Sequence, residues 1–110
     1  MEATAKLTFA RLSPQKARLV VDMVRGKGVQ EALNILKFSP QKAAEIVAKL
    51  VRSAVANAEQ KGAGDVDRLV VKSIYVDQGP VLRRFMPKGR GSASRIRKPT
   101  SHITVVLGEQ

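Results

Sequence analysis

The chain has 110 residues, no cysteine, and 20 Lys and Arg against 9 Asp and Glu, which gives a net charge of +11. This length suits one domain with a modest core and is too short for two. The missing cysteines exclude disulfides and thiolate metal sites, and no apolar run approaches the roughly 18 residues of a membrane-spanning helix. We therefore expect a single cytoplasmic domain, residues 1–110, with no membrane insertion and a polyanionic partner.

The first quarter of the chain predicts a strand and then a helix. Small or apolar residues alternate with polar ones from Ala3 to Phe9, and this period of two predicts a strand with one buried face. Ser13 and Pro14 then open a helix, because serine is a good N-cap and proline fits the first helical position. Gly26 ends that helix, whose buried side is expected to consist of Ala17, Val20, Val21 and Val24.

Two further helices are predicted between residues 29 and 61. Val29–Phe38 has the apolar spacing of a short helix, and Pro40–Lys61 has that of a long one that supplies most of the core. The five residues SPQKA begin at Ser13 and again at Ser39. An internal duplication would explain this, but we favour one capping solution used twice, because repeat proteins need about three or more units.

Two strands follow, Leu69–Val76 and His102–Leu107, both rich in β-branched residues. A two-residue turn at Gly89-Arg90, with the Gly-X order of a type II′ hairpin, sets the register between the two strands. A slip of one residue would lose the apolar pairs across them. Lys72 then falls on the apolar face, where this register does not explain it. The expected pairs are Val76 with Ile103, Ile74 with Val105, Asp77 with His102, Pro80 with Pro99, and Arg84 with Arg95.

Between those strands, Val81–Thr100 holds seven basic residues and no acidic one. Its few large apolar residues are scattered among the charges, a composition that does not suit a buried element. We therefore expect a long hairpin, residues 80–99, that leaves a globular body of residues 1–79 and 100–110 and lies against a polyanion. The predicted fold class is α+β, with three helices packed on a small antiparallel sheet and a long protruding β-hairpin.

Some residues admit a chemical as well as a structural interpretation. His102 is the only histidine, and without a second histidine or a cysteine it suits a structural or RNA-contacting role better than that of a general base or metal ligand. Asp65 and Asp67 fit a solvated loop better than a paired-carboxylate site. Residues 89–91 (Gly-Arg-Gly) lack the strand-to-helix setting of a phosphate loop. We therefore expect no enzyme, no cofactor and no metal.

A second basic set surrounds the first helix and consists of Lys16, Arg18, Arg25 and Lys27. Alone, it fits an ordinary solvated face as well as an RNA-binding one. Arg11 and the helix N-terminus at Ser13 favour the nucleic-acid-binding interpretation, because a helix N-terminus attracts anions such as phosphates. Phe85 and Met86 could form a minor core, but on so basic an arm we favour stacking on bases or filling crevices in RNA.

Three stretches together resemble the family of bacterial large-subunit ribosomal protein number twenty-two: GPVLRRFMPKGRGSASRIRKPTSHITVVL, ARLSPQKARLVVDMVRGKGVQEAL and SAVANAEQ. The resemblance covers essentially the whole chain. It implies a small α+β domain bound to 23S ribosomal RNA at the outer surface of the large subunit, with the hairpin lining the nascent-peptide exit tunnel. It also implies neighbouring large-subunit proteins and the nascent polypeptide as partners, and no homo-oligomer.

The charge pattern and the resemblance together give two sets of expected site residues. The RNA-binding set is Arg11, Ser13, Lys16, Arg18, Arg25, Lys27, Arg83, Arg84, Phe85, Met86, Lys88, Arg90, Arg95, Arg97, Lys98, Thr100 and His102. The tunnel-lining set is Leu82, Arg83, Arg84, Lys88, Gly89, Arg90, Gly91 and Arg95. Two other classes stay open: a DNA-binding architectural protein whose basic β-arm wraps the duplex, and a small RNA-directed enzyme, for which no catalytic set is visible.

Overall fold

The computed structural model describes the backbone of residues 2–62, 66–79, 82–88 and 92–109, and the side chains of residues 2–62, 67–79 and 99–109. Its elements confirm the α+β class, with three helices and a small antiparallel sheet. None of the helices in these ranges is long and apolar enough to cross a membrane. In chain order, the elements are β1 (Glu2–Ala10), α1 (Pro14–Val24), α2 (Val29–Lys37), α3 (Lys42–Gln60), a 3-10 turn (Val66–Arg68), β2 (Leu69–Gln78), β3 (Leu82–Lys88), β4 (Ser92–Lys98) and β5 (Ser101–Glu109).

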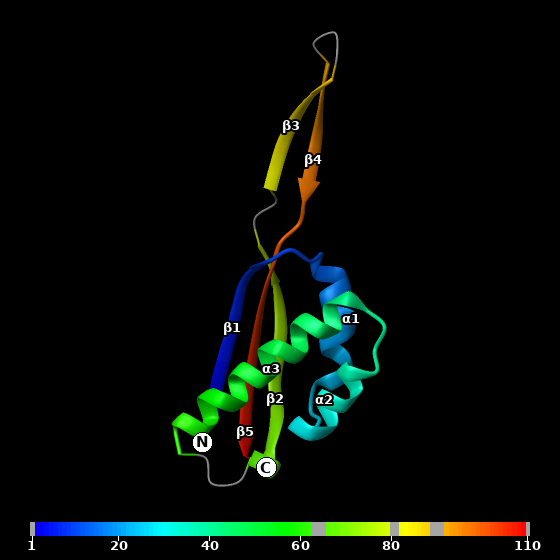
Figure 1. Cartoon of the computed structure of the whole chain (residues 1–110). Coiled ribbons are helices and arrows are strands. Elements are labelled where there is room, and N and C mark those ends of the chain that lie inside the picture. The colour runs from blue at the N-terminus through cyan, green and yellow to red at the C-terminus, as the bar shows by residue number, and fades with distance from the viewer. Residues whose placement is uncertain (1, 63–65, 80–81, 89–91, 110) are drawn as a thin grey trace.

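β5 is the central strand of a three-stranded antiparallel sheet with the order β1-β5-β2. The helices cover one face of this sheet: α3 packs on β1 and β5, and α1 packs on β2 (Figure 1). Alternate residues of β5 point into the resulting core, and Ile103, Val105 and Leu107 are completely buried. The opposite face of the sheet carries exposed side chains, among them Lys6 and Tyr75.

The predicted pairing of β2 with β5 is confirmed. Lys72 also finds its explanation, because the register shifts by one between Val71 and Ser73, which makes Lys72 the extra residue of a β-bulge. The bulge turns this side chain out of the core, and its ammonium pairs with the carboxylate of Glu2. The pairs that agree with the prediction are Val76 with Ile103, Ile74 with Val105, and Asp77 with His102.

β3 and β4 form a separate two-stranded sheet beyond the end of the three-stranded one (Figure 1). With it, the molecule is elongated and measures 64 × 26 × 16 Å. The predicted register is wrong here by one residue, because Arg84 lies opposite Ile96 and not opposite Arg95. Two arginines still face each other, however, since Arg83 pairs with Arg97.

The register changes where the hairpin joins the body. Between the last pair of the central sheet and the first pair of the hairpin, one arm has residues 79–81 and the other only residues 99–100. At the tip, the last described pair joins Lys88 with Ser92. The turn itself and the predicted pairing of the two prolines lie outside the described residues.

The two SPQKA copies begin their helices differently. Ser13 is the N-cap of α1, and its Oγ accepts a hydrogen bond of 3.3 Å from the N–H of Lys16. α3 instead starts at Lys42, so the predicted N-cap at Ser39 is wrong. The N–H of Ser39 still donates to a carbonyl of α2 at 3.3 Å, which ties this serine to the end of the preceding helix.

Phe9 is expected on the buried face of β1, but its side chain is 60% exposed. The pairing of β1 with β5 is irregular between Leu7 and Ala10, and Phe9 adopts a positive φ of 56° within that irregularity. Ala10 is buried again. The irregularity therefore turns one phenyl ring outward without removing the next residue from the core.

Candidate nucleic-acid interface

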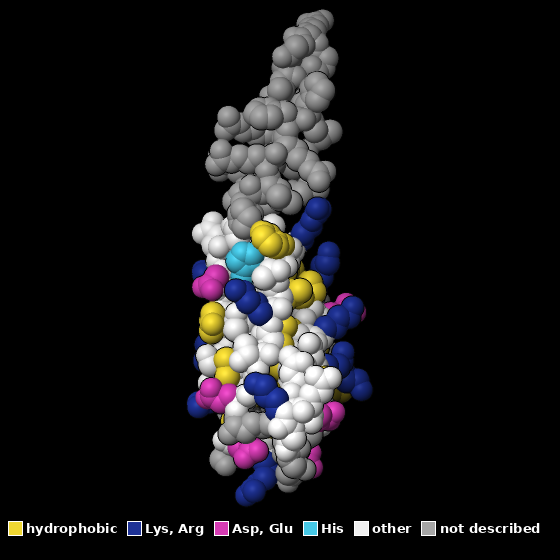
Figure 2. Space-filling model, turned by 90° about the vertical axis from the view of Figure 1, so that its left-hand side faces the viewer, with side chains coloured by type: hydrophobic (Ala, Val, Ile, Leu, Met, Phe, Trp, Pro, Cys, Tyr) yellow, Lys and Arg dark blue, Asp and Glu magenta, His cyan; other side chains and the backbone are white. Residues whose placement is uncertain are grey.

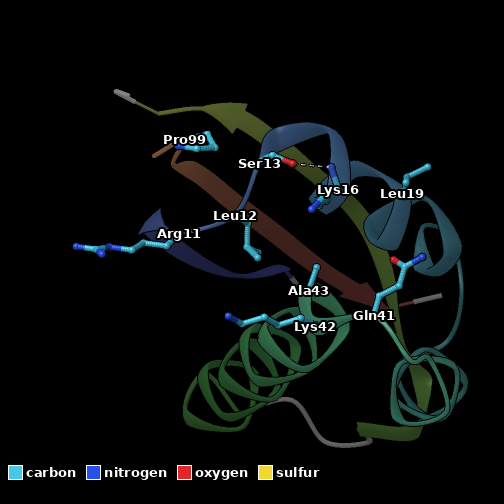
Figure 3. A pocket seen from close by; sticks show the side chains of 9 residues that line it. All are labelled: Arg11, Leu12, Ser13, Lys16, Leu19, Gln41, Lys42, Ala43 and Pro99. Carbon is cyan, nitrogen blue, oxygen red and sulfur yellow. Dashed lines mark hydrogen bonds between the residues drawn. The ribbon is translucent and has the colours of Figure 1, made fainter. Parts of the chain in front are cut away.

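A pocket of about 570 Å³ lies where the first residues of α1 and α3 approach each other (Figure 3). Among the residues that line it in the described part of the chain are three cations, Arg11, Lys16 and Lys42, and no acidic side chain. Pro99 also lines it, which places the pocket where the hairpin joins the body. The fold therefore brings cations from two separate segments of the body, residues 11–16 and 41–43, to one pocket.

Two helix N-termini add to the positive character of this pocket. Ser13 caps α1, whose first turn holds no acidic residue. Gln41, the N-cap of α3, makes no capping hydrogen bond with its side chain. The first N–H groups of a helix have no partner within the helix and carry a partial positive charge, so they favour anions. Three side-chain cations and two helix starts together suit a phosphate group.

The repeated SPQKA segments meet at this pocket. Ser13 and Lys16 line it from the first copy, and Gln41 and Lys42 line it from the second. Lys16 and Lys42 hold the same place in the two copies. Lys42 is absent from the residues predicted for RNA, although the repeat was a visible signal that it shares the environment of Lys16.

Two predicted RNA-binding arginines are engaged with the edge of the sheet. The Nη2 of Arg18 donates to the carbonyl of Val76 at 3.2 Å. The Nε and Nη2 of Arg25 both donate to the carbonyl of Ile74, at 3.3 and 2.8 Å, and its Nη1 forms an ion pair of 2.6 Å with Asp22. These contacts give the two arginines a role in the fold, and we leave them out of the interface proposed below.

The same edge of β2 is closed further along by the link between α1 and α2. The N–H of Gly26 donates to the carbonyl of Val71 at 2.9 Å, and the N–H of Val71 donates to the carbonyl of Lys27 at 2.8 Å. Lys27 therefore serves the fold through its main chain while its side chain stays exposed. These contacts cover part of the edge along which β2 could otherwise pair with another chain.

His102 lies on the open face of the sheet, at its hairpin end. Its Nδ1 accepts a hydrogen bond of 3.0 Å from the main-chain N–H of Phe9. The two rings meet edge to face, with 4.9 Å between centroids and an interplanar angle of 88°. In Figure 2 the histidine lies beside hydrophobic side chains at the upper end of the described body. The described residues contain no group of three or more His, Cys, Asp or Glu side chains that could hold a metal ion.

Thr100 is a predicted RNA-binding residue that the fold buries. It is 1% exposed, and its Oγ1 lies so close to Gly79 that a Cβ at that glycine would overlap it. The free protein therefore offers no surface of Thr100 to RNA. We leave this residue, too, out of the proposed interface.

The remaining predicted residues belong to the hairpin. The strands place them by register only, because their side chains lie outside the described residues, as do Gly89, Arg90 and Gly91 altogether. Those placed on β3 and β4 are Leu82, Arg83, Arg84, Phe85, Met86, Lys88, Arg95, Arg97 and Lys98.

Fold and charge define a class of protein: a small, strongly basic α+β protein with a cation-lined pocket and a cation-rich hairpin, features typical of nucleic-acid binding. The chain belongs to the family described as ribosomal protein L22p/L17e, whose model matches residues 5–108. It is 76% identical over 110 residues to the large ribosomal subunit protein uL22 of Geobacter sulfurreducens, covering 100% of this chain and 99% of that protein. The uL22 of Syntrophotalea carbinolica is also 76% identical, with 100% of both chains covered, and that of Geobacter metallireducens is 71% identical.

The chain is thus a structural constituent of the large ribosomal subunit and not an enzyme. This confirms the resemblance noted in the sequence. It gives no support to the DNA-binding architectural protein or to the RNA-directed enzyme.

Proposed function

We propose that the chain binds 23S ribosomal RNA through two surfaces, the pocket between α1 and α3 and the basic hairpin, and that the hairpin lines the nascent-peptide exit tunnel. The observation that carries this proposal is the pocket, in which cations and helix N-termini converge without a neutralising carboxylate among its described lining residues. The proposal adds Lys42 to the predicted set. In the body it keeps Arg11, Ser13 and Lys16, which line the pocket, and Lys27 and His102, which are additional contacts outside it. In the hairpin it keeps all the predicted residues.

The pocket suits phosphates of the RNA backbone. Arg11, Lys16 and Lys42 repel one another in the free protein, and a phosphate among them replaces that repulsion with attraction. Such contacts position the RNA and release its counterions, which makes affinity fall with salt. The buried Leu12 and Ala43 line the same pocket and give it an apolar wall against which a sugar or base can pack.

The hairpin supports a contact at a distance from the body. Each of its strands has seven residues, about 23 Å at the usual rise of an extended strand. Like charges directly opposite in a sheet are destabilising, and here Arg83 lies opposite Arg97. RNA phosphates along the hairpin would neutralise this pair. A narrow basic arm of this length can enter RNA while the body remains outside it, as lining a tunnel requires.

RNA binding is tested by following the protein in sedimented lysates and by measuring its affinity for a 23S transcript at several salt concentrations. We expect the native protein to travel with the large subunit. The triple variant Arg11→Gln, Lys16→Gln, Lys42→Gln should lower the slope of log affinity against log salt by roughly 2 to 3, at about 0.7–0.9 per phosphate contact. The matched triple Lys37→Gln, Arg52→Gln, Lys61→Gln removes three cations that do not line this pocket. An equal slope change in both triples would refute the pocket as the phosphate site.

The tunnel-lining role needs its own test. A photo-crosslinking residue in place of Arg90, at the hairpin tip, should capture the nascent chain in translating ribosomes. The same residue in place of Lys72, at the far end of the body, should not. Ribosomes that incorporate the Arg90 variant normally but never yield a nascent-chain adduct would contradict the proposal.

A further inference from the structure

Phe9 is a large apolar residue that the fold turns toward solvent at a conformational cost. Its side chain is 60% exposed, and its φ is 56°. Positive φ is uncommon for residues other than glycine and is unfavourable for a bulky side chain. Strain of this kind points to a function when the surrounding structure holds it in place.

Several contacts hold this strained segment. The main-chain N–H of Phe9 is bound by His102 Nδ1 at 3.0 Å, and the imidazole supports one edge of the phenyl ring. On the far side of the irregularity, Ala10 and Leu12 are buried. The hydroxyl of Ser101 donates to the carbonyl of Leu12 at 2.7 Å. The segment that carries the ring is therefore held on both sides of Phe9, as a preformed binding surface requires.

The surroundings of the ring indicate the ligand. Arg11, which lines the basic pocket, follows Phe9 by two residues. Among the described residues, Thr8 next to Phe9 is polar and exposed, and the imidazole of His102 lies against the ring. An exposed ring that lies against an imidazole, two residues before a cation of the basic pocket, suits a nucleobase of a phosphate-bearing chain better than an apolar peptide.

We propose that Phe9 is a nucleobase-stacking residue that receives an unpaired base of the ribosomal RNA, with His102 supporting the ring. This inference deepens the RNA-binding function proposed above and rests on it. Aromatic side chains hold unstacked bases in single-stranded loops and bulges of RNA, where both faces of a base are accessible. The structure thus assigns the body a base contact in addition to its phosphate contacts.

The test compares variants of the full chain binding a 23S transcript over a range of salt concentrations. Phe9→Ala should weaken binding about 5- to 150-fold, the loss expected for one stacked base, and leave the salt slope unchanged because no phosphate contact is lost. Phe9→Tyr should bind within about threefold of wild type, since its ring also stacks. Phe38→Ala is the matched control, because Phe38 is 81% exposed but lies at the end of α2 and lines neither the pocket nor the open sheet face.

Phe9→Gly separates stacking from folding. Glycine accepts a positive φ without strain, so this variant should melt at a higher temperature than Phe9→Ala and still bind RNA as weakly. The stacking role would be overturned if Phe9→Ala and Phe9→Gly bound RNA with wild-type affinity, or if Phe9→Tyr lost as much affinity as Phe9→Ala. In either case, normal binding and a normal salt slope of the wild-type chain would leave the RNA-binding function intact. A wild-type chain that did not bind the transcript would overturn both proposals.

Discussion

Lys16 lies in the first turn of α1 and Arg25 is the C-cap of the same helix. They carry the same charge, but the structure gives them different roles. Replacing Arg25 by methionine keeps an unbranched aliphatic chain but removes the guanidinium. The two hydrogen bonds to the carbonyl of Ile74 and the ion pair with Asp22 are then lost. Replacing Lys16 by methionine removes a cation of the pocket. We therefore expect the first change to lower stability and the second to lower RNA affinity.

The expected loss for Arg25→Met follows from its contacts. Hydrogen bonds to a charged group contribute about 1.5–3 kcal/mol, but the side chain of Arg25 is 47% exposed, and screening by solvent lowers the expected contribution to about 1–1.5 kcal/mol. The ion pair spans three residues on one helix and adds about 0.2–0.5 kcal/mol. The sum of roughly 1.2–2 kcal/mol corresponds to a fall of about 5–9 °C in melting temperature for a chain of this size.

Thermal unfolding followed by circular dichroism measures the first effect, and the salt dependence of binding to a 23S transcript measures the second. Arg25→Met should melt early and keep the wild-type salt slope. Lys16→Met should melt no earlier than the wild type, because it relieves repulsion among the pocket cations, and should lose about 0.7–0.9 of slope. If Arg25→Met melted like the wild type and lost as much slope as Lys16→Met, its guanidinium would be a phosphate ligand and the assignment to the sheet edge would be wrong.

Three further changes test the fold around the site. Ser101→Ala removes a buried hydroxyl that donates to a main-chain carbonyl at 2.7 Å and should cost about 1–3 kcal/mol in chemical denaturation; an unchanged midpoint would contradict this. Gly79→Ala would place a Cβ against Thr100 at the base of the hairpin and should lower the melting temperature, because the contact involves main-chain as well as side-chain atoms. A hydrogen bond from Lys72 lowers the pKa of the Glu2 carboxyl, so the small stability advantage of wild type over Glu2→Gln should be present at neutral pH and vanish as the pH falls through the pKa of the folded carboxyl. A difference that grew in acid would refute that coupling.

The sequence predicted the register of the body because apolar residues constrain it. Ile74 and Val76 must share a face with Ile103 and Val105, and a slip of one residue would turn all of them to solvent. No such constraint acts in the hairpin, whose sequence does not alternate apolar with charged residues, and the register shifts by one residue between the body and the hairpin. The prediction that extended the body's register to the tip therefore failed there.

Local conformations and individual contacts were harder to predict than periodicity. The alternation in β1 assigns Phe9 to the core, and no residue type in the segment signals the positive φ that turns it outward. The helical spacing places Lys16, Arg18 and Arg25 on the outside of α1, which is correct. It does not show that the arginines reach carbonyls of β2 whereas the lysine lines the pocket, since both outcomes leave a basic side chain at the surface.

The repeated SPQKA segment connects the sequence with the site in a way that the capping interpretation missed. If its purpose were only to start helices, Ser39 would cap α3 as Ser13 caps α1, and it does not. The two copies instead share the pocket, into which each contributes a lysine. Bringing two helix N-termini and three cations together costs stability in the free protein, since all of these charges have the same sign. Such a local conflict with the rest of the fold is expected at functional sites, and an RNA phosphate is the ligand that would relieve it.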